Sequence, residues 1–243
     1  MVGIGMATTG ACPGTVIVQV ATGIESGTYV ALGGILGGIL YVRFGSWLKQ
    51  RPSSDTPTSE YPLTIDSKYN LKPNTVLLTY EVICLTIIAV SLILGGVDSK
   101  SVYLHPVAGG ILISLAQAAS ILLSGRPVGV STAYAEAGEL FWRIFSSKGS
   151  GGKAPEVSAM VFAAGIFAGS FSIAKYLPMD ANSSDISALR AIFGGCIMIV
   201  GSRLAGGCTS GHGISGMSAF SVSSVITVAS MFAGGIAIAT ILD

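Results

Sequence analysis

Long apolar segments alternate with short polar ones along the chain. Six of the apolar segments are about as long as a membrane-spanning helix, which needs roughly 20 mostly apolar residues. They are residues 27–48, 75–97, 106–124, 156–178, 187–204 and 217–242. The pattern predicts an all-α integral membrane protein with about six long transmembrane helices.

Three polar, glycine-rich segments interrupt this pattern where an ordinary loop is not expected. The first lies within residues 2–22, where Pro13-Gly14 would break a helix beside Cys12. The second is 125–134, and the third is 201–216, which contains six glycines. Irregular backbone at membrane depth is tolerated only where it is buried in protein or lines a polar cavity. We therefore expect two or three short re-entrant or broken helices that line a path for a small solute.

The polar breaks resemble one another. TGAC at Thr9–Cys12 matches AGGC at Ala205–Cys208, and Gly125-Arg126-x-x-Gly129 matches Ser202-Arg203-x-x-Gly206. Internal repeats of this kind are typical of transporters whose binding sites are formed by discontinuous helices. The matches predict a pseudo-symmetric repeat.

The rest of the chain suggests one polytopic membrane domain over residues 1–243. Residues 49–73 are polar and rich in Pro, Ser and Thr, which predicts a flexible loop outside the bilayer. Residues 135–147 carry Glu136 and other charged residues among aromatic ones, which suggests a short amphipathic or interfacial helix. The chain begins with no flank before its first apolar stretch, which suggests that a first helix is missing.

Composition and charge agree with a membrane protein. Only 10% of the residues are charged and 51% are hydrophobic, whereas soluble domains carry about 25% charged residues. The net charge of +1 gives no reason to expect a nucleic-acid partner. The four cysteines lie in or beside apolar segments without a CxxC pair, which argues against a disulfide framework.

The breaks contain the groups that could bind an anion. Glycine-rich backbone, as around Gly10, lets successive N–H groups point at one place, and the N-termini of half-helices add positive potential. Arg126 and Arg203 place positive charge beside two breaks, either in the path or as interfacial anchors. Cys12 and Cys208 add weak S–H donors and polarizable sulfur, which would suit a sulfur-containing oxyanion. Hydroxyl donors in the breaks include Ser131, Thr132, Thr209 and Ser210.

The sequence gives less support to two other kinds of site. Zinc normally takes three or four protein ligands, and the breaks offer only Cys12, Cys208 and His212, without ligand-type spacing, so we predict no metal and no cofactor. A catalytic Cys–His pair usually has a third, orienting group, and no buried Asp or Asn stands out, so we do not expect an enzyme. A membrane sulfurtransferase that forms a persulfide on Cys208 remains the alternative. The roles of Glu81, Cys84 and Cys196 stay open.

At all three breaks the sequence resembles a known family. TGACPGT (Thr9–Thr15) and RLAGGCTSGHGISG (Arg203–Gly216) resemble signature stretches of the YeeE/YedE family of sulfur-transport membrane proteins, and GVSTAY (Gly129–Tyr134) resembles the middle break of its longer members. The resemblance implies thiosulfate uptake by a pseudo-symmetric protein whose path thiols hydrogen-bond the ion in succession. Cys12 and Cys208 would be these thiols. The second site would be shaped by Gly207, Thr209, Ser210, Gly211 and His212.

The same resemblance implies the setting. Bacterial relatives are similar in working beside small cytosolic sulfur-carrier proteins, so we expect such a partner, together with the bilayer of a plasma or inner membrane. The sequence departs from the family in the middle break, where Val130-Ser131 stands in place of a glycine and a thiol. A third path cysteine therefore has no counterpart. We expect a transporter of a small sulfur oxyanion, with thiosulfate as the expected ion.

Overall fold

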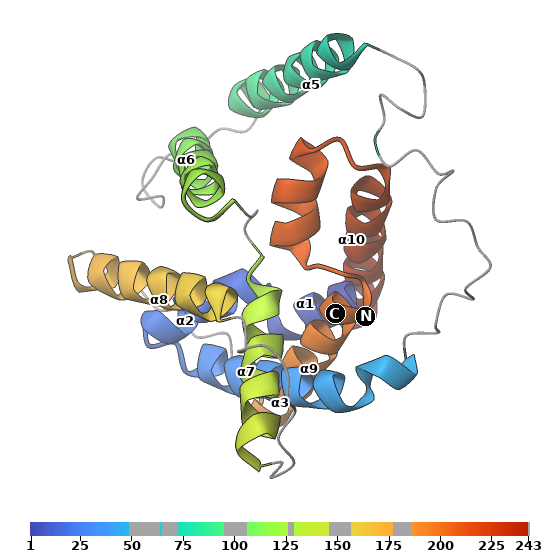
Figure 1. The fold of residues 1–243 in the computed structure, drawn as a ribbon. Helices are drawn as coiled ribbons and strands as arrows, with labels where there is room; N and C mark the ends of the chain where they lie inside the picture. Colours follow the sequence, from blue (N-terminus) through green and yellow to red (C-terminus); the bar gives the residue numbers. More distant parts are fainter. Residues whose placement is uncertain are drawn as a thin grey trace.

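The computed structural model describes residues 1–48, 64, 72–94, 106–125, 129–145, 157–176 and 186–242. Within these ranges the named elements are all helices, and an isolated bridge joins Thr64 to Ser221. Figure 1 shows the arrangement of the helices. The all-α prediction is confirmed for this part of the chain. Most of the predicted 49–73 loop lies outside the described residues.

All six predicted long segments form helices, with ends that differ from the prediction by a few residues. They are α3 (Glu25–Leu48), α5 (Pro73–Leu94), α6 (Pro106–Ser124), α8 (Ser158–Tyr176), α9 (Ala188–Leu204) and α10 (Val222–Leu242). Among the described residues, four stretches are long and apolar enough to cross a membrane: Val2–Ala21, Glu25–Gly45, Ser158–Tyr176 and Val222–Ile241. The apolar parts of α5 and α6 are shorter.

Short helices follow the three predicted breaks. The first break separates α1 (Val2–Thr9) from α2 (Pro13–Ala21), as Pro13-Gly14 indicated. After the second break comes α7 (Ser131–Phe145), and after the third comes η1 (Thr209–Gly216), a π-helix. A bend of 43° separates α9 from η1, and the pair together has the length and apolarity of one broken span.

The short amphipathic or interfacial helix that we expected over 135–147 forms, but it starts earlier than predicted. It begins at Ser131, inside the predicted break, and most residues of its first two turns are buried. The cause lies in Glu136, whose carboxylate accepts hydrogen bonds from the backbone N–H groups of Ala159 (3.2 Å) and Met160 (2.9 Å). The first amides of a helix have no partner within it, so α8 supplies the hydrogen bonds that allow this carboxylate to be buried.

Glycines bring α3 against α9. A Cβ atom added at Gly33 would overlap the carbonyl oxygen of Ile192, and one at Gly37 would lie 2.7 Å from the carbonyl oxygen of Cys196. These glycines are four apart and share one face of α3. Since lipid gives helices no hydrophobic reason to associate, such close backbone contacts set the packing of membrane helices.

The neighbouring face of α3 packs against α7 in the same way. A Cβ atom at Gly34 would lie 2.9 Å from the Tyr134 ring, and one at Gly38 would overlap the Tyr134 carbonyl oxygen. On the α7 side, a Cβ atom at Gly138 would lie 2.7 Å from the backbone of Gly38. The GGILGG segment of α3 is therefore held between two helices.

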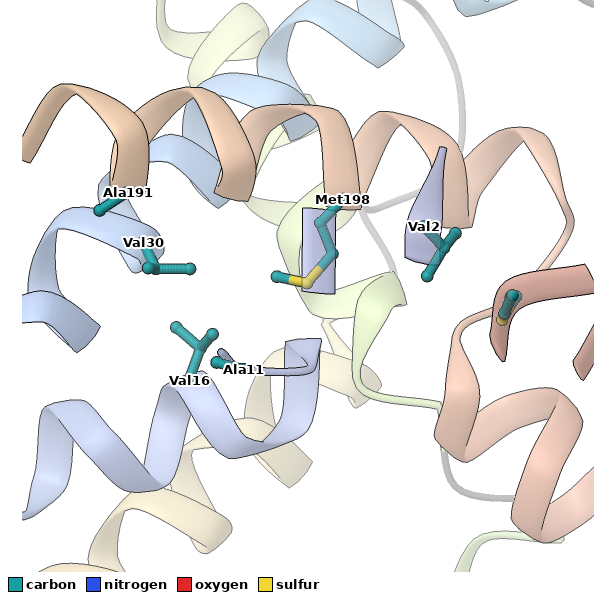
Figure 2. Packing of buried hydrophobic residues seen from close by; sticks show 7 residues of the cluster. Val2, Ala11, Val16, Val30, Ala191 and Met198 are labelled. Atoms are coloured by element: carbon teal, nitrogen blue, oxygen red, sulfur yellow. The ribbon is translucent and has the colours of Figure 1, made fainter. Parts of the chain in front are cut away.

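A hydrophobic cluster joins the first broken helix to the rest of the protein (Figure 2). Its members come from the first break and from neighbouring helices, and they are Val2, Ala11, Val16, Val30, Ala191, Met198 and Met231. Ala11 lies in the break itself and is buried. The first break is thus part of the interior.

Two helices lie apart from this group, α5 and α6 (Figure 1). Tyr80 of α5 makes an edge-to-face contact with Phe220, with ring centroids 5.4 Å apart. Gln117 of α6 donates a hydrogen bond of 2.9 Å to the Ser215 hydroxyl in η1. These contacts connect α5 and α6 to the region of the third break.

The packing of α3 can be tested with paired glycine substitutions. Gly38→Ala should destabilise the protein by about 1–3 kcal/mol, because the added methyl group overlaps the backbone of α7. Gly169→Ala on α8, where nothing lies within 4 Å of the added methyl group, should be neutral or stabilising by up to about 1 kcal/mol, since alanine favours helix. Thermal unfolding in detergent measures both, and equal melting temperatures for the two variants would contradict this packing.

Candidate functional site

Cys12 and Cys208 occupy the same local structure in two parts of the chain. Two residues before each, a glycine adopts the left-handed conformation, with φ of 64° at Gly10 and 81° at Gly206. Each cysteine is extended, with φ of −101° and −100° respectively, and is the N-cap residue of the next helix. Glycine adopts positive φ at little steric cost. The matched TGAC and AGGC segments thus share one backbone conformation.

Cys12 caps α2 reciprocally with Thr15. The Thr15 backbone N–H donates to Cys12 Sγ at 3.4 Å, and the Cys12 backbone N–H donates to Thr15 Oγ1 at 2.7 Å. This is a capping box in which sulfur takes the place of the usual hydroxyl oxygen. Thr15 was not among the predicted site residues, although the three-residue spacing is the signal of such a box. Cys12 is only half-buried.

Cys208 is enclosed, with 1% of its surface exposed. Its Sγ lies 3.0 Å from the Ser210 hydroxyl. The backbone amides of Gly211 and Ser131, and the Ser131 hydroxyl, also form hydrogen bonds with this sulfur. The N-termini of η1 and α7 therefore point toward the same atom. Each helix N-terminus carries a partial positive charge and attracts anions.

The first turn of α7 also reaches the first break. The Tyr134 hydroxyl donates to the Pro13 carbonyl oxygen at 3.2 Å, next to Cys12. A Cβ atom at Gly14 would lie 3.8 Å from Val130 at the start of α7. Since Ser131 contacts Cys208, the first turn of α7 touches both other breaks. Residues from all three predicted breaks thus meet in the folded protein.

Arg203 points inward from the end of α9. Its guanidinium donates to Thr132 Oγ1 at 3.1 Å and lies over the Tyr41 ring, 5.6 Å from the ring centroid. Its Nε is buried and has no hydrogen-bond partner among the described residues. Nothing in the sequence indicated the contact with Tyr41. The other predicted arginine, Arg126, lies outside the described residues.

His212 holds the third break to α10. Its Nε2 lies 3.1 Å from the Ala205 carbonyl oxygen, and its Nδ1 lies 3.0 Å from the Ser224 hydroxyl. A carbonyl can only accept, so Nε2 carries the proton and Nδ1 accepts from Ser224. A Cβ atom at Gly207 would lie 3.0 Å from the His212 ring, so glycine leaves room for the imidazole.

Both ring nitrogens of His212 are thus occupied. In the described part of the chain, no three His, Cys, Asp or Glu side chains are grouped to hold a metal.

The remaining predicted residues fall into two groups. Thr209, Ser210 and Gly211 form the first turn of η1, beside Cys208. Three residues whose roles were left open lie outside this group: Glu81 is exposed on α5, Cys84 is half-buried on α5, and Cys196 is half-buried on α9.

An apolar pocket of about 240 Å³ lies beside Tyr134, between α2, α3, α7 and α8. Its lining is Ile17, Val20, Ala31, Ile35, Ala133, Tyr134, Ala137, Met160, Ala163 and Phe167. An ion would lose its hydration there without gaining hydrogen bonds. The groups suited to an anion are those around Cys208.

The two break cysteines should differ in reactivity. In variants that retain a single cysteine, Cys12 should react with a maleimide in the folded protein, because it is half-buried and at a helix start. Cys208 should react at least about tenfold more slowly until the protein is denatured, because an enclosed thiol reacts only through local opening. Mass spectrometry of timed reactions measures both rates. Comparable rates in the folded state would show that Cys208 is not enclosed.

Comparison with known proteins places the chain in a family. Residues 1–237 match the family described as Sulphur transport. The chain is 30% identical over 142 residues to a probable transporter of Xylella fastidiosa strain 9a5c, a match that covers 58% of this chain and 96% of that protein. The probable transporter of strain Temecula1 matches with the same identity and coverage. With its apolar helices and broken spans, the chain belongs to the sulphur transport family, the YeeE/YedE proteins, and is a multi-pass integral membrane protein.

Proposed function

We propose that this protein carries thiosulfate across the membrane through the place where the three breaks meet. Its family supports transport of a sulfur compound. The observation that carries the proposal is the buried Cys208 sulfur, which receives hydrogen bonds from the first turns of both α7 and η1. A soft sulfur atom and the positive ends of two helices are thereby combined at one point.

Thiosulfate has chemical features that match both the Cys208 sulfur and the positive helix ends. Its oxygen atoms accept hydrogen bonds from backbone amides and from hydroxyl groups such as those of Ser131 and Ser210. Its terminal sulfur is large and polarizable, as is the sulfur of Cys208. An S–H group is a weak donor, so it holds the ion without trapping it. Weak binding at several points permits both entry and release.

Passage would then use two similar stations. Cys12 and Cys208 each start a short helix after a left-handed glycine, so an ion leaving one meets a thiol and a helix N-terminus again at the other. The ion passes intact and no covalent bond forms or breaks. We place Arg203 and Thr132 beside the second station. A small cytosolic sulfur-carrier protein is the proposed recipient of the delivered sulfur.

Uptake of radiolabelled thiosulfate into proteoliposomes tests the proposal. Cys208→Ala should lower uptake at least roughly tenfold, since a hydrogen bond to a charged group contributes about 1.5–3 kcal/mol. Cys196→Ala, a control on α9 away from the breaks, should leave uptake unchanged. Sulfate should compete less well than thiosulfate in the wild-type protein, because it lacks the terminal sulfur.

Two outcomes would overturn the proposal. One is wild-type uptake by Cys208→Ala at an equal amount of reconstituted protein. The other is a stable gain of one sulfur atom on Cys208 after exposure to thiosulfate, detected by mass spectrometry. Such an adduct would instead support a membrane sulfurtransferase, in which Cys208 forms a persulfide.

A further inference from the structure

Arg203 brings a full positive charge into the interior. It belongs to the last turn of α9, and its side chain reaches α7 through Thr132 and α3 through the ring of Tyr41. The Thr132 hydroxyl that accepts its hydrogen bond is uncharged. The aromatic face attracts the cation without neutralising it.

In the described part of the chain, no carboxylate forms an ion pair with Arg203. Glu136 is the buried carboxylate there, and the backbone amides of Ala159 and Met160 occupy its oxygens. The buried Nε of Arg203 has no partner among the described residues. A guanidinium inside a membrane protein is costly unless an anion or several acceptors compensate it.

Arg203 and Cys208 meet consecutive residues of α7. Thr132 accepts a hydrogen bond from Arg203, and Ser131 forms hydrogen bonds with the Cys208 sulfur. Both residues belong to the first turn of α7, whose Thr132 and Ala133 backbone N–H groups donate to carbonyl oxygens just before the helix, at 3.3 and 3.1 Å. The cation, the thiol and a helix N-terminus are therefore gathered around one turn.

From this arrangement we infer that Arg203 makes the site selective for divalent over monovalent sulfur anions. The inference rests on the proposed transport function and assigns one property of it to one residue. A helix N-terminus acts as about half a positive charge, so those of α7 and η1 together supply about one. Arg203 supplies the second, and the sum matches the two negative charges of thiosulfate. Without Arg203 the remaining positive charge would suit a monovalent anion.

The roles of two residues are then separable. Cys208 recognises sulfur, so its loss should weaken the binding of thiosulfate more than that of sulfate. Arg203 recognises charge, so its loss should weaken the binding of both divalent anions to the same extent. Thiocyanate, which is monovalent and contains sulfur, then becomes the better competitor.

The experiment measures thiosulfate uptake into proteoliposomes with sulfate and thiocyanate as competitors. Arg203→Gln should raise the KM for thiosulfate at least roughly tenfold, as expected for removing one partner of a desolvated charge pair. Its inhibition by thiocyanate should stay the same or become stronger. Arg203→Lys keeps the charge and should keep the divalent preference, although it loses the planar fork. Arg190→Gln, at the exposed other end of α9, is the control and should behave as wild type.

A second variant neutralises the charge while Arg203 remains in place. Thr132→Asp puts a carboxylate where the Arg203 guanidinium now donates, and it should shift the preference to monovalent anions as Arg203→Gln does. If either variant transports less but keeps the wild-type ratio of sulfate to thiocyanate inhibition, Arg203 has only a structural role and the inference fails.

Binding separates this failure from failure of the transport proposal. If wild-type proteoliposomes take up no thiosulfate, the proposed function fails. The inference is then decided by thermal unfolding in detergent, since an anion that binds the folded protein raises its melting temperature. Thiosulfate and sulfate should stabilise the wild type at lower concentrations than thiocyanate, and Arg203→Gln should remove that difference. Equal stabilisation of the wild type by all three anions would overturn the inference.

Discussion

The close backbone contact of α3 with α9 and α7 is the constraint on which the site depends. Gly33 and Gly37 admit α9, and Gly34 and Gly38 admit α7. Helix α9 carries Arg203 and leads to Cys208. The first turn of α7 contacts both of these residues. In lipid, helices associate through such packing and not through hydrophobic exclusion from water. A change of one methyl group on α3 would therefore move the parts of the site relative to one another.

The long helices could be predicted because the bilayer demands a length and a composition that the sequence displays openly. The first break could also be predicted, since Pro13-Gly14 cannot continue a helix. The buried position of the first turns of α7 could not be predicted from the sequence. Glu136 marks a surface helix by its charge, and only the amides of α8, more than twenty residues away, make its burial possible. The π-helical form of η1 likewise has no composition signal, because the segment contains several glycines and small polar residues that would suit a loop as well.

The local backbone of the candidate site could be predicted from the sequence, but the contacts between its residues could not. The repeated Gly-x-Cys pattern identified Cys12 and Cys208, and the structure gives both the same backbone conformation. The contact of Ser131 with Cys208 joins distant parts of the chain, and no sequence pattern predicts it. In the middle break Ser131 has a hydroxyl where the repeat would offer a thiol, and this hydroxyl forms a hydrogen bond with the Cys208 sulfur of the third break.

The π-helical geometry of η1 has a consequence for how this chain can vary. Each π-type hydrogen bond encloses one more residue than an α-helical one, as where the Met217 N–H reaches the His212 carbonyl oxygen. Removing a single residue from Thr209–Gly216 would let the segment relax to an ordinary α-helix and would rotate its N-terminal end by about 100° relative to α10. If the deleted residue lay between Cys208 and His212, Cys208 would face away from α7 while His212 kept its hydrogen bond to Ser224 of α10. The direction in which the Cys208 thiol points therefore depends on the length of this segment as well as on its residues. Insertions or deletions within the segment would change that direction.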